Sequence, residues 1–274
     1  MTDPITLIDV ADRLGVHYMT AYRYVRTGRL PAVKDSGQWR VFENDLAAFE
    51  ARPAKAPPRK DLLPTLIEER LIAGDENGTY QLLENALASG ADAEEVYLDL
   101  MSPAMVGVGR RWHEGDISIA DEHVATSTAL RVIARLGPRV SSRGRMKGTI
   151  LLATISDDYH YLPTAMLRDL LRFRGFDVQD LGANTPPESI FDRASGLADL
   201  LAVGVSATSS GHDHVMRETL SKLAGLHVPI VVGGAAFSGL DHITSLGPCI
   251  PSNSARDALS IFETIHAEAR SKAR

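Results

Sequence analysis

The sequence predicts a multidomain protein: an all-α winged helix-turn-helix, then a four-helix bundle, then an α/β doubly wound parallel sheet. Two helical segments around a glycine precede residue 30, four amphipathic segments fill residues 64–136, and strand and helix patterns alternate from residue 148. The predicted boundaries are 1–52 for the first domain, 53–63 for a linker, 64–140 for the bundle and 146–270 for the α/β domain.

Composition is typical of soluble globular proteins. The 274 residues suffice for about two to three domains, and 44% hydrophobic and 23% charged residues are ordinary values. No apolar run approaches the roughly 18 residues that span a bilayer, and the N-terminus lacks a signal-peptide pattern. With Cys249 as the single cysteine, an internal disulfide is impossible. We therefore expect a cytoplasmic protein without a membrane partner.

Charge is distributed unevenly along the chain. Residues 1–60 carry ten Lys and Arg against seven Asp and Glu, a net of +3, whereas the remainder carries nineteen against twenty-eight, a net of −9. A basic head on an acidic body is typical of a small DNA-binding module attached to a larger sensing or enzymatic body.

The first fifty residues contain start and stop signals for two short helices. Thr6 is placed to cap a helix, with Asp9 in the capping-box position, and Gly15 ends it. A second helix is predicted over Val16–Arg26, ended by Gly28. This order indicates a helix-turn-helix.

A wing follows the second helix. Short strands are predicted over 31–34 and 38–42, joined by a turn at Asp35-Ser36-Gly37. Asn44-Asp45 is then expected to cap a last helix over Leu46–Ala51. The matching stretches L-I-D-V-A-D-R-L-G-V, T-A-Y-R-Y-V-R-T-G-R-L-P and W-R-V resemble the excisionase-like, MerR-related winged helix-turn-helix family over about 45 residues.

That resemblance implies binding to double-stranded operator DNA. The second helix would enter the major groove and expose Thr20, Tyr22 and Arg23. Four basic residues would contact phosphates or the adjacent minor groove: Arg26, Arg29, Lys34 and Arg40. The alternative is a solvated basic face on a module that binds protein. Because one module buries too little surface for tight specific binding, paired copies in a homo-oligomer, a dimer or tetramer, are expected.

The middle of the chain combines four helical stripes with an unusual polar motif. Residues 52–63 are rich in Pro and Lys and are expected to form an extended linker. Between the third and fourth stripes, Trp112 and His113 are followed by Glu122 and His123. An aromatic plate, a carboxylate and two imidazoles in one region suit a large flat ligand or a metal. For an isolated motif, a core Trp and surface His residues are the favoured alternative.

The last segment contains a strand–loop–helix–strand unit from Ile150 to Gly182. Its first loop holds Asp158 and His160, in the position where α/β proteins bind ligands. A carboxylate two residues away can fix one nitrogen of a His and leave the other for a metal. On this stretch alone, an ordinary loop with a surface His is favoured. No G-x-G-x-x-G follows the first strand, which argues against a nicotinamide or flavin nucleotide.

Residues 64–265 resemble the cobalamin-binding unit of the CarH/LitR light-dependent repressors, a four-helix cap followed by a Rossmann-like domain. The cap pattern W-x9-E-H is present as Trp112, Glu122 and His123. The loop pattern Asp-x-His-x-x-Gly is present up to Pro163, which replaces the glycine. Further matches follow the later strands and would surround the nucleotide tail of the cofactor: Ser206, Thr208, Gly233 and Gly234.

The resemblance implies a repressor, not an enzyme, that uses adenosylcobalamin as a light sensor. His160 would bind cobalt from below, with Asp158 holding its other nitrogen. Trp112 would cover the upper face, Glu122 would lie near the adenosyl ribose, and His113 would ligate cobalt after light cleaves the cobalt–carbon bond. Assembly and DNA binding would change with light. The alternatives are a corrinoid carrier for a methyltransferase, a cobalamin-level sensor without light response, and a photoreceptor using a bilin.

Overall fold

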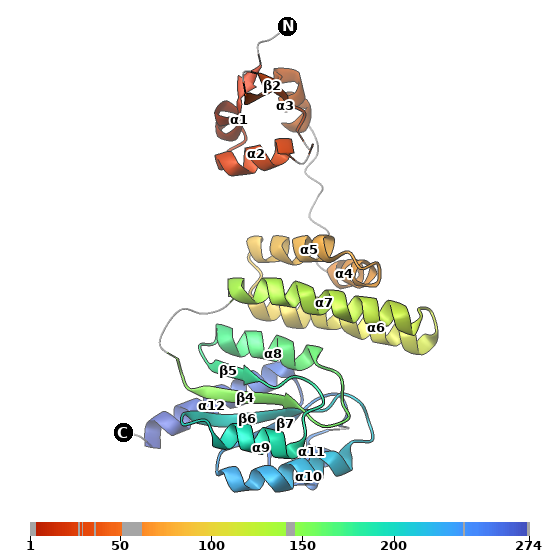
Figure 1. Ribbon diagram of the computed structural model, residues 1–274, viewed down its shortest axis with the longest axis vertical. Helices are drawn as coiled ribbons and strands as arrows, with labels where there is room; N and C mark the ends of the chain where they lie inside the picture. Colours follow the sequence, from red (N-terminus) through yellow and green to blue (C-terminus); the bar gives the residue numbers. More distant parts are fainter. Residues whose placement is uncertain are drawn as a thin grey trace. The chain divides into compact units, whose positions relative to one another are not determined.

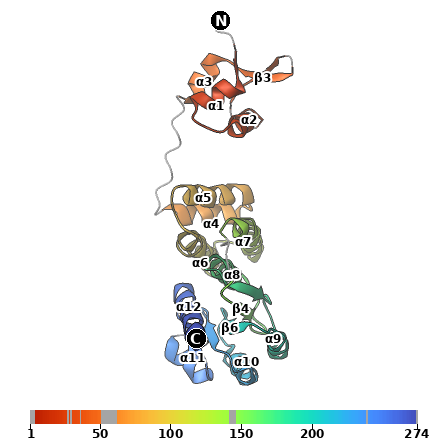
Figure 2. The same ribbon diagram turned by 90° about the vertical axis from the view of Figure 1, so that its left-hand side faces the viewer.

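The computed structural model describes residues 4–26, 28, 30–35, 37–50, 62–140, 146–237 and 239–272, without the side chains of residues 23, 139 and 140 (Figures 1 and 2). The chain divides into two compact units, Met1–Lys60 and Asp61–Arg274. Among the described residues, none of the helices is both long and apolar enough to cross a membrane.

The first unit is a helix-turn-helix with a three-stranded antiparallel sheet. Its elements are β1 (Ile5–Thr6), α1 (Leu7–Arg13), α2 (Tyr18–Arg26), β2 (Val33–Asp35), β3 (Gln38–Val41) and α3 (Glu43–Glu50), with sheet order β1-β3-β2. Thr6 and Asp9 form the predicted capping box at the start of α1. Strand β1 was not predicted, because two residues carry no alternation; it forms because extended Thr6 pairs with Arg40.

Two helix starts in this unit differ from the sequence prediction. Helix α2 begins at Tyr18 and not at Val16. Helix α3 begins at Glu43, before the expected Asn44-Asp45 cap, because the carbonyl of Phe42 already accepts from the backbone N–H groups of Asp45 and Leu46. The basic end of α1 is tied to α3 by Arg13, whose guanidinium lies 2.8 Å from Glu43 and 3.2 Å from Glu50.

The second unit starts with the predicted helical cap. Its helices are α4 (Leu63–Ile72), α5 (Glu76–Ala88), η2 (Glu95–Met101), α6 (Ser102–Glu114) and α7 (Ile119–Val140). The third predicted helix is divided, because η2 has π-helical geometry and continues directly into α6. Gly115 ends α6 in a left-handed conformation, and a Ser118–Asp121 capping box precedes α7.

The rest of the second unit is the predicted doubly wound parallel sheet. Its strands are β4 (Thr149–Thr154), β5 (Asp177–Asp180), β6 (Leu200–Ser206), β7 (Ile230–Gly233) and β8 (Ile250–Pro251), in the order β5-β4-β6-β7-β8. The connecting helices are α8 (Leu162–Phe173), α9 (Pro187–Ser195), α10 (Asp213–Leu223), α11 (Leu240–Leu246) and α12 (Ala255–Lys272). The order reverses between β4 and β6, so the loops after these strands flank the topological switch point.

Strand β4 is buried on both faces, as its continuous apolar run predicts. Ile150 and Leu152 belong to the core shared with α8, α12 and the cap, whereas Leu151 and Ala153 belong to the core under α9, α10 and α11. Helix α8 therefore lies between the sheet and the cap helices (Figure 1).

The cap contacts the α/β part through polar groups of η2 and the residue before it. The buried Tyr97 hydroxyl donates to Asp169 of α8 over 3.0 Å. Asp99 pairs with Arg256 of α12 at 2.8 Å, and Glu94 pairs with Arg174. These contacts fix the η2 end of the cap, and they lie at the opposite end of the η2–α6 segment from Trp112.

Candidate functional site

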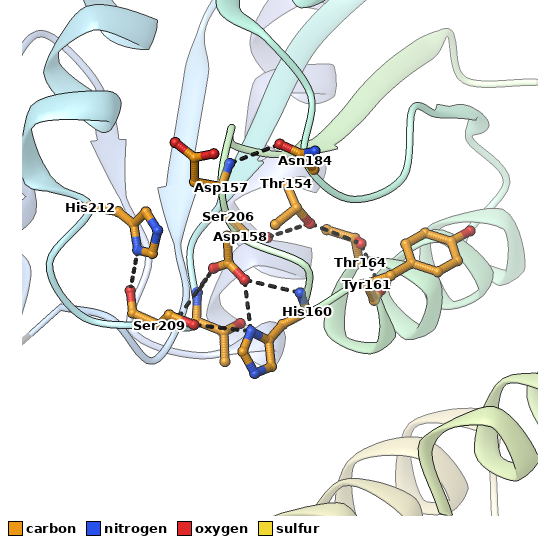
Figure 3. A network of polar contacts seen from close by, with 11 residues as sticks. Thr154, Asp157, Asp158, His160, Tyr161, Thr164, Asn184, Ser206, Ser209 and His212 are labelled. Atoms are coloured by element: carbon orange, nitrogen blue, oxygen red, sulfur yellow. Dashed lines mark hydrogen bonds and ion pairs between the residues drawn. The ribbon is translucent and has the colours of Figure 1, made fainter. Parts of the chain in front are cut away.

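The loop after β4 holds the acidic and imidazole groups that the sequence singled out. Figure 3 shows Asp158 between the loop that carries His160 and the loop after β6. The Asp158 side chain has no exposed surface. Its Oδ1 accepts from the backbone N–H of His160 at 3.0 Å and lies 2.7 Å from His160 Nδ1. Its Oδ2 accepts from the backbone N–H groups of Thr208 and, at 3.2 Å, Ser209.

These contacts keep Asp158 ionised. Burial is the largest single influence and raises the pKa of this carboxyl group. The hydrogen bonds from Thr208, His160 and Ser209 together outweigh burial, so the pKa of Asp158 lies below its ordinary value. An ionised carboxylate only accepts hydrogen bonds, so the proton on the His160 ring is assigned to Nδ1.

With Nδ1 of His160 held by Asp158, Nε2 is the ring nitrogen left to bind a ligand. The side chain is 55% exposed although its partner Asp158 is fully buried. Ser209 Oγ lies 3.2 Å from the same Nδ1. An imidazole fixed at one nitrogen by a buried carboxylate, with the other nitrogen directed outward, is the arrangement that metal-binding histidines adopt.

A cavity of about 600 Å³ opens beside this loop, at the carboxyl ends of β6 and β7. Thr164 and Ser206 line it, and their hydroxyls flank that of Thr154: Thr154 Oγ1 lies 3.5 Å from Thr164 Oγ1 and 3.3 Å from Ser206 Oγ. Two glycines allow close packing at its rim. A Cβ on Gly234 would lie 1.9 Å from the Ala207 carbonyl oxygen, and one on Gly233 would lie 3.3 Å from that of Ser252.

Pro163 lines the same cavity and lies in the first turn of α8. A proline is well accommodated there, because the N–H groups of the first turn have no partner within the helix. Thr164 Oγ1 donates to the Tyr161 carbonyl at 2.8 Å and completes the turn. The replacement of the expected glycine is therefore compatible with the local backbone.

The cap residues form a second group. Trp112 and His113 lie in the last turn of α6, and Glu122 and His123 in the first turn of α7. Glu122 contacts its neighbours, with Oε2 2.6 Å from His123 Nδ1 and Oε1 accepting from Thr126 at 2.7 Å. In the described part of the chain, no hydrogen bond or ring contact joins these four residues to Asp158 or His160.

One face of α6 nevertheless continues from the cavity toward this group. Ser102 and Val106 line the cavity. At about 100° per residue, His113 lies on the same helical face, and Trp112 lies beside it. Trp112 is 48% exposed, which is unusual for a residue that would serve only the core.

Sequence reasoning did not identify four residues of the site: Thr154, Thr164, Asn184 and Ser209. The two threonines read as ordinary strand and helix residues. Ser209 follows Ser206 in the hydroxyl-rich stretch S-A-T-S-S, which was the available signal. Asn184 lies in L-G-A-N-T-P, a stretch that matches the strand end of the resembled cobalamin domain, but its left-handed φ of 52° and its partners cannot be read from the sequence.

In the first unit, two residues of α2 are less exposed than the sequence predicts. Tyr22 was expected on the exposed face of α2, but it is half-buried and packs against the core. It follows the fully buried Ala21 by one residue, about 100° around the helix, and so flanks the buried face. Thr20 is also half-buried. The exposed residues of α2 include Met19 and Arg26.

The basic wing residues differ from one another. Lys34 is exposed, with Nζ 5.4 Å from the centroid of the Trp39 ring. Arg40 is half-buried, and its buried Nε has no hydrogen-bond partner within the described part of the first unit. The Arg23 side chain and Arg29 lie outside the described residues.

Comparisons with known proteins match all three parts of the chain. Residues 65–136 and 148–244 each match a family model described as a B12 binding domain, and residues 5–52 match a helix-turn-helix domain. Trimethylamine corrinoid protein 1 of Methanosarcina acetivorans is 27% identical over 194 residues, which cover 68% of this chain and 88% of the relative. The methanol–corrinoid protein of Methanosarcina barkeri is 23% identical over 227 residues, covering 82% and 86%.

A solved structure shares the fold of the second unit. The Methanosarcina barkeri monomethylamine corrinoid protein matches with a TM-score of 0.63 at 19% identity, covering 74% of this chain and 97% of its own. Together the matches support a cobalamin-type cofactor in a chain that also carries a helix-turn-helix domain.

Proposed function

We propose that this protein, which joins B12-binding domains to a helix-turn-helix domain, is a light-responsive transcriptional regulator that uses adenosylcobalamin. The observation that carries the proposal is the Asp158–His160 pair, with its buried carboxylate and outward Nε2, in a chain that also has a DNA-binding type of domain. His160 would allow the second unit to bind a cobalt cofactor, and the helix-turn-helix domain would convert the state of that cofactor into a change in DNA binding.

The residues present fit a cobalamin. His160 Nε2 would ligate the cobalt, and Asp158 would keep the ring oriented and hold the ring proton on Nδ1. The cavity beside Ser206 and Gly233 would take the nucleotide tail, because its glycine rim allows an extended group to lie against backbone. When bound, adenosylcobalamin supplies a cobalt–carbon bond that visible light cleaves.

The cap would convert the state of the cofactor into movement. Its η2 end is fixed by Tyr97 and Asp99, whereas Trp112 and His113 lie at the far end of α6. In the dark, Trp112 would pack over the upper face of the cofactor. His113, beside Trp112, is the residue that would be available to hold the cobalt after illumination, and the α6–α7 end of the cap would move. Glu122 and His123 lie at the start of α7 and would move with it.

Control of transcription would then follow from assembly. One helix-turn-helix gives modest DNA affinity, and a dark homo-oligomer would present several of them to one operator. Exposed Arg26 and Lys34 are the described basic residues placed to meet phosphates. Movement of the cap would change the oligomeric state and release the DNA, which makes repression in the dark the expected output.

The test combines a spectrum, an elution volume and a DNA-binding measurement on the full chain. The protein is loaded with adenosylcobalamin in the dark, and the three quantities are recorded before and after green light. The proposal expects all three to change together in the wild type. His160→Ala should lose the axial protein nitrogen, whereas His214→Ala, an exposed histidine of α10, should behave as wild type. An oligomer and spectrum unchanged by light would exclude the proposed mechanism.

A second candidate is a corrinoid carrier for a methyltransferase. It is favoured by the relatives, which are named as corrinoid proteins and are 27% and 23% identical to this chain over 194 and 227 residues. A carrier has no use for a helix-turn-helix, so sequence-specific DNA binding by the purified chain distinguishes the candidates. A carrier would also show no light-dependent change of assembly.

A further inference from the structure

We propose that Asn184, in the loop between β5 and α9, is the positioning residue that sets the His160 loop for cobalt. The inference rests on the proposed ligation of cobalt by His160 and concerns what holds that loop in place. Asn184 touches neither the imidazole nor the Asp158 carboxylate among the described contacts, so its effect on His160 would be transmitted through the backbone.

Asn184 contacts three consecutive residues that lead into His160. Its Oδ1 accepts from the backbone N–H of Asp157 at 2.9 Å, and its own backbone N–H donates to the Asp158 carbonyl at 2.9 Å. Its Nδ2 donates to the Tyr159 hydroxyl at 3.3 Å. Figure 3 shows the Asn184 side chain directed at the Asp157 backbone, on the side of the loop away from Ser209.

The loop needs such a partner because its backbone is unusual. Asp157 has a φ of 65°, in the left-handed region that non-glycine residues rarely adopt. A turn of this kind leaves the Asp157 N–H without a partner in the strand, and Asn184 Oδ1 supplies one. Asn184 itself has a φ of 52°, and asparagine tolerates this region better than most residues.

The backbone of the β5–α9 loop next to Asn184 is held in place independently of the Asn184 side chain. Thr185 pairs with Ile155 in an isolated parallel bridge, and its N–H donates to the Thr154 carbonyl at 2.9 Å. The β5–α9 loop is therefore attached to the end of β4 by bonds that do not involve the Asn184 side chain. What the Asn184 side chain adds is confined to the Asp157 turn and Tyr159, directly before His160.

The His160 loop is thus held from two sides with separate roles. The loop after β6 fixes the Asp158 carboxylate through Thr208 and Ser209. The loop after β5 fixes the Asp157–Tyr159 backbone through Asn184. The bonds to the Asp158 carboxylate would set the tautomer of the His160 ring. The bonds from Asn184 would set the position of the loop backbone, and with it how far Nε2 reaches toward the cobalt.

The experiment uses the full chain labelled with ¹⁵N and loaded with cob(II)alamin. In electron paramagnetic resonance, an axial ¹⁵N from the protein splits the cobalt signal into doublets, whereas the cofactor's own ¹⁴N base gives triplets. Asn184→Gly keeps the left-handed backbone and removes the side-chain bonds. We expect the ratio of cobalt ligated by a protein nitrogen (doublets) to cobalt without such a ligand to fall about tenfold in this variant. The loss of one to two hydrogen bonds predicts a change of this size. Far-UV circular dichroism serves as the folding check.

Two variants separate positioning from general damage. Asn184→Asp keeps the acceptor for the Asp157 N–H and tolerates the same φ, so the doublet should persist. Tyr159→Phe removes only the weakest of the three contacts and should also keep it. A doublet of wild-type intensity in folded Asn184→Gly overturns the proposal, as does its loss in Asn184→Asp. Absence of the doublet from the wild type overturns both this proposal and cobalt ligation by His160.

Discussion

The substitution Tyr97→Phe tests whether the polar contact between cap and sheet stabilises the second unit. Tyr97 is fully buried in η2, and its hydroxyl donates to Asp169 Oδ2 over 3.0 Å. The other carboxylate oxygen of Asp169 accepts from Arg168 Nε at 2.9 Å. Burial, with the nearby charge of Asp169, raises the pKa of Tyr97, so the phenol remains a donor at every working pH.

The expected loss is about 2 kcal/mol of unfolding free energy. A hydrogen bond to a charged group contributes roughly 1.5–3 kcal/mol, and phenylalanine keeps the ring packing while leaving Oδ2 of a buried carboxylate without this donor. Asp169 is 3% exposed, so water has little access to replace the hydroxyl. The loss should fall on the cap and the sheet together, because Tyr97 and Asp169 belong to different layers of one unit.

Urea unfolding followed by tryptophan fluorescence measures this loss. The two tryptophans of the chain lie one in each unit, Trp39 in the first and Trp112 in the second, so a Trp39→Phe background reports the second unit alone. Tyr159→Phe is the matched control: this tyrosine is 71% exposed and should change stability by less than about 0.5 kcal/mol. An equally small change in Tyr97→Phe would refute the reasoning.

Three further predictions follow from single contacts. Thr6→Ala should lower the unfolding free energy of the first unit by about 1 kcal/mol. Hydrogen bonds from Thr6 lower the pKa of Asp9, so the stabilisation they give is present above about pH 4 and is lost as the solution is acidified through the lowered pKa. A series of melting curves at different pH values detects this loss. Gly234→Ala should disrupt the cavity rim, because its Cβ would overlap the Ala207 carbonyl, and abolish cobalamin retention in dialysis. Lys34→Ala should weaken DNA binding uniformly across sequences and lower the salt slope by about one, whereas a sequence-dependent loss would contradict a phosphate contact.

Local signals in the sequence determined most of the elements. The Thr6–Asp9 box starts α1 as predicted, because both partners lie within one helical turn. The apolar run Thr149–Thr154 became a strand buried on both faces, because alternating strands and helices leave a parallel sheet covered by helices. These patterns depend on neighbours in the chain, so one sequence suffices to read them.

The site was predicted in part. Asp158 and His160 are two residues apart, and their contact needed no long-range information. The contacts of Asp158 with Thr208 and Ser209 join residues fifty positions away, and only the order β5-β4-β6 brings those loops together. Asn184 was missed for the same reason. Its partners lie in another loop, and its left-handed backbone has no signature in composition or periodicity.

The sequence by itself determined the order of the domains, the helical and strand patterns, and the short spacing that brings His160 to Asp158. The tertiary structure decided how that histidine is held, which end of the cap is attached to the sheet, and where the cavity lies. The physical reason is the distance along the chain over which each interaction acts. Capping and periodic burial act within a few residues, whereas the buried carboxylate of Asp158 and the Tyr97–Asp169 bond exist only where distant segments exclude water together.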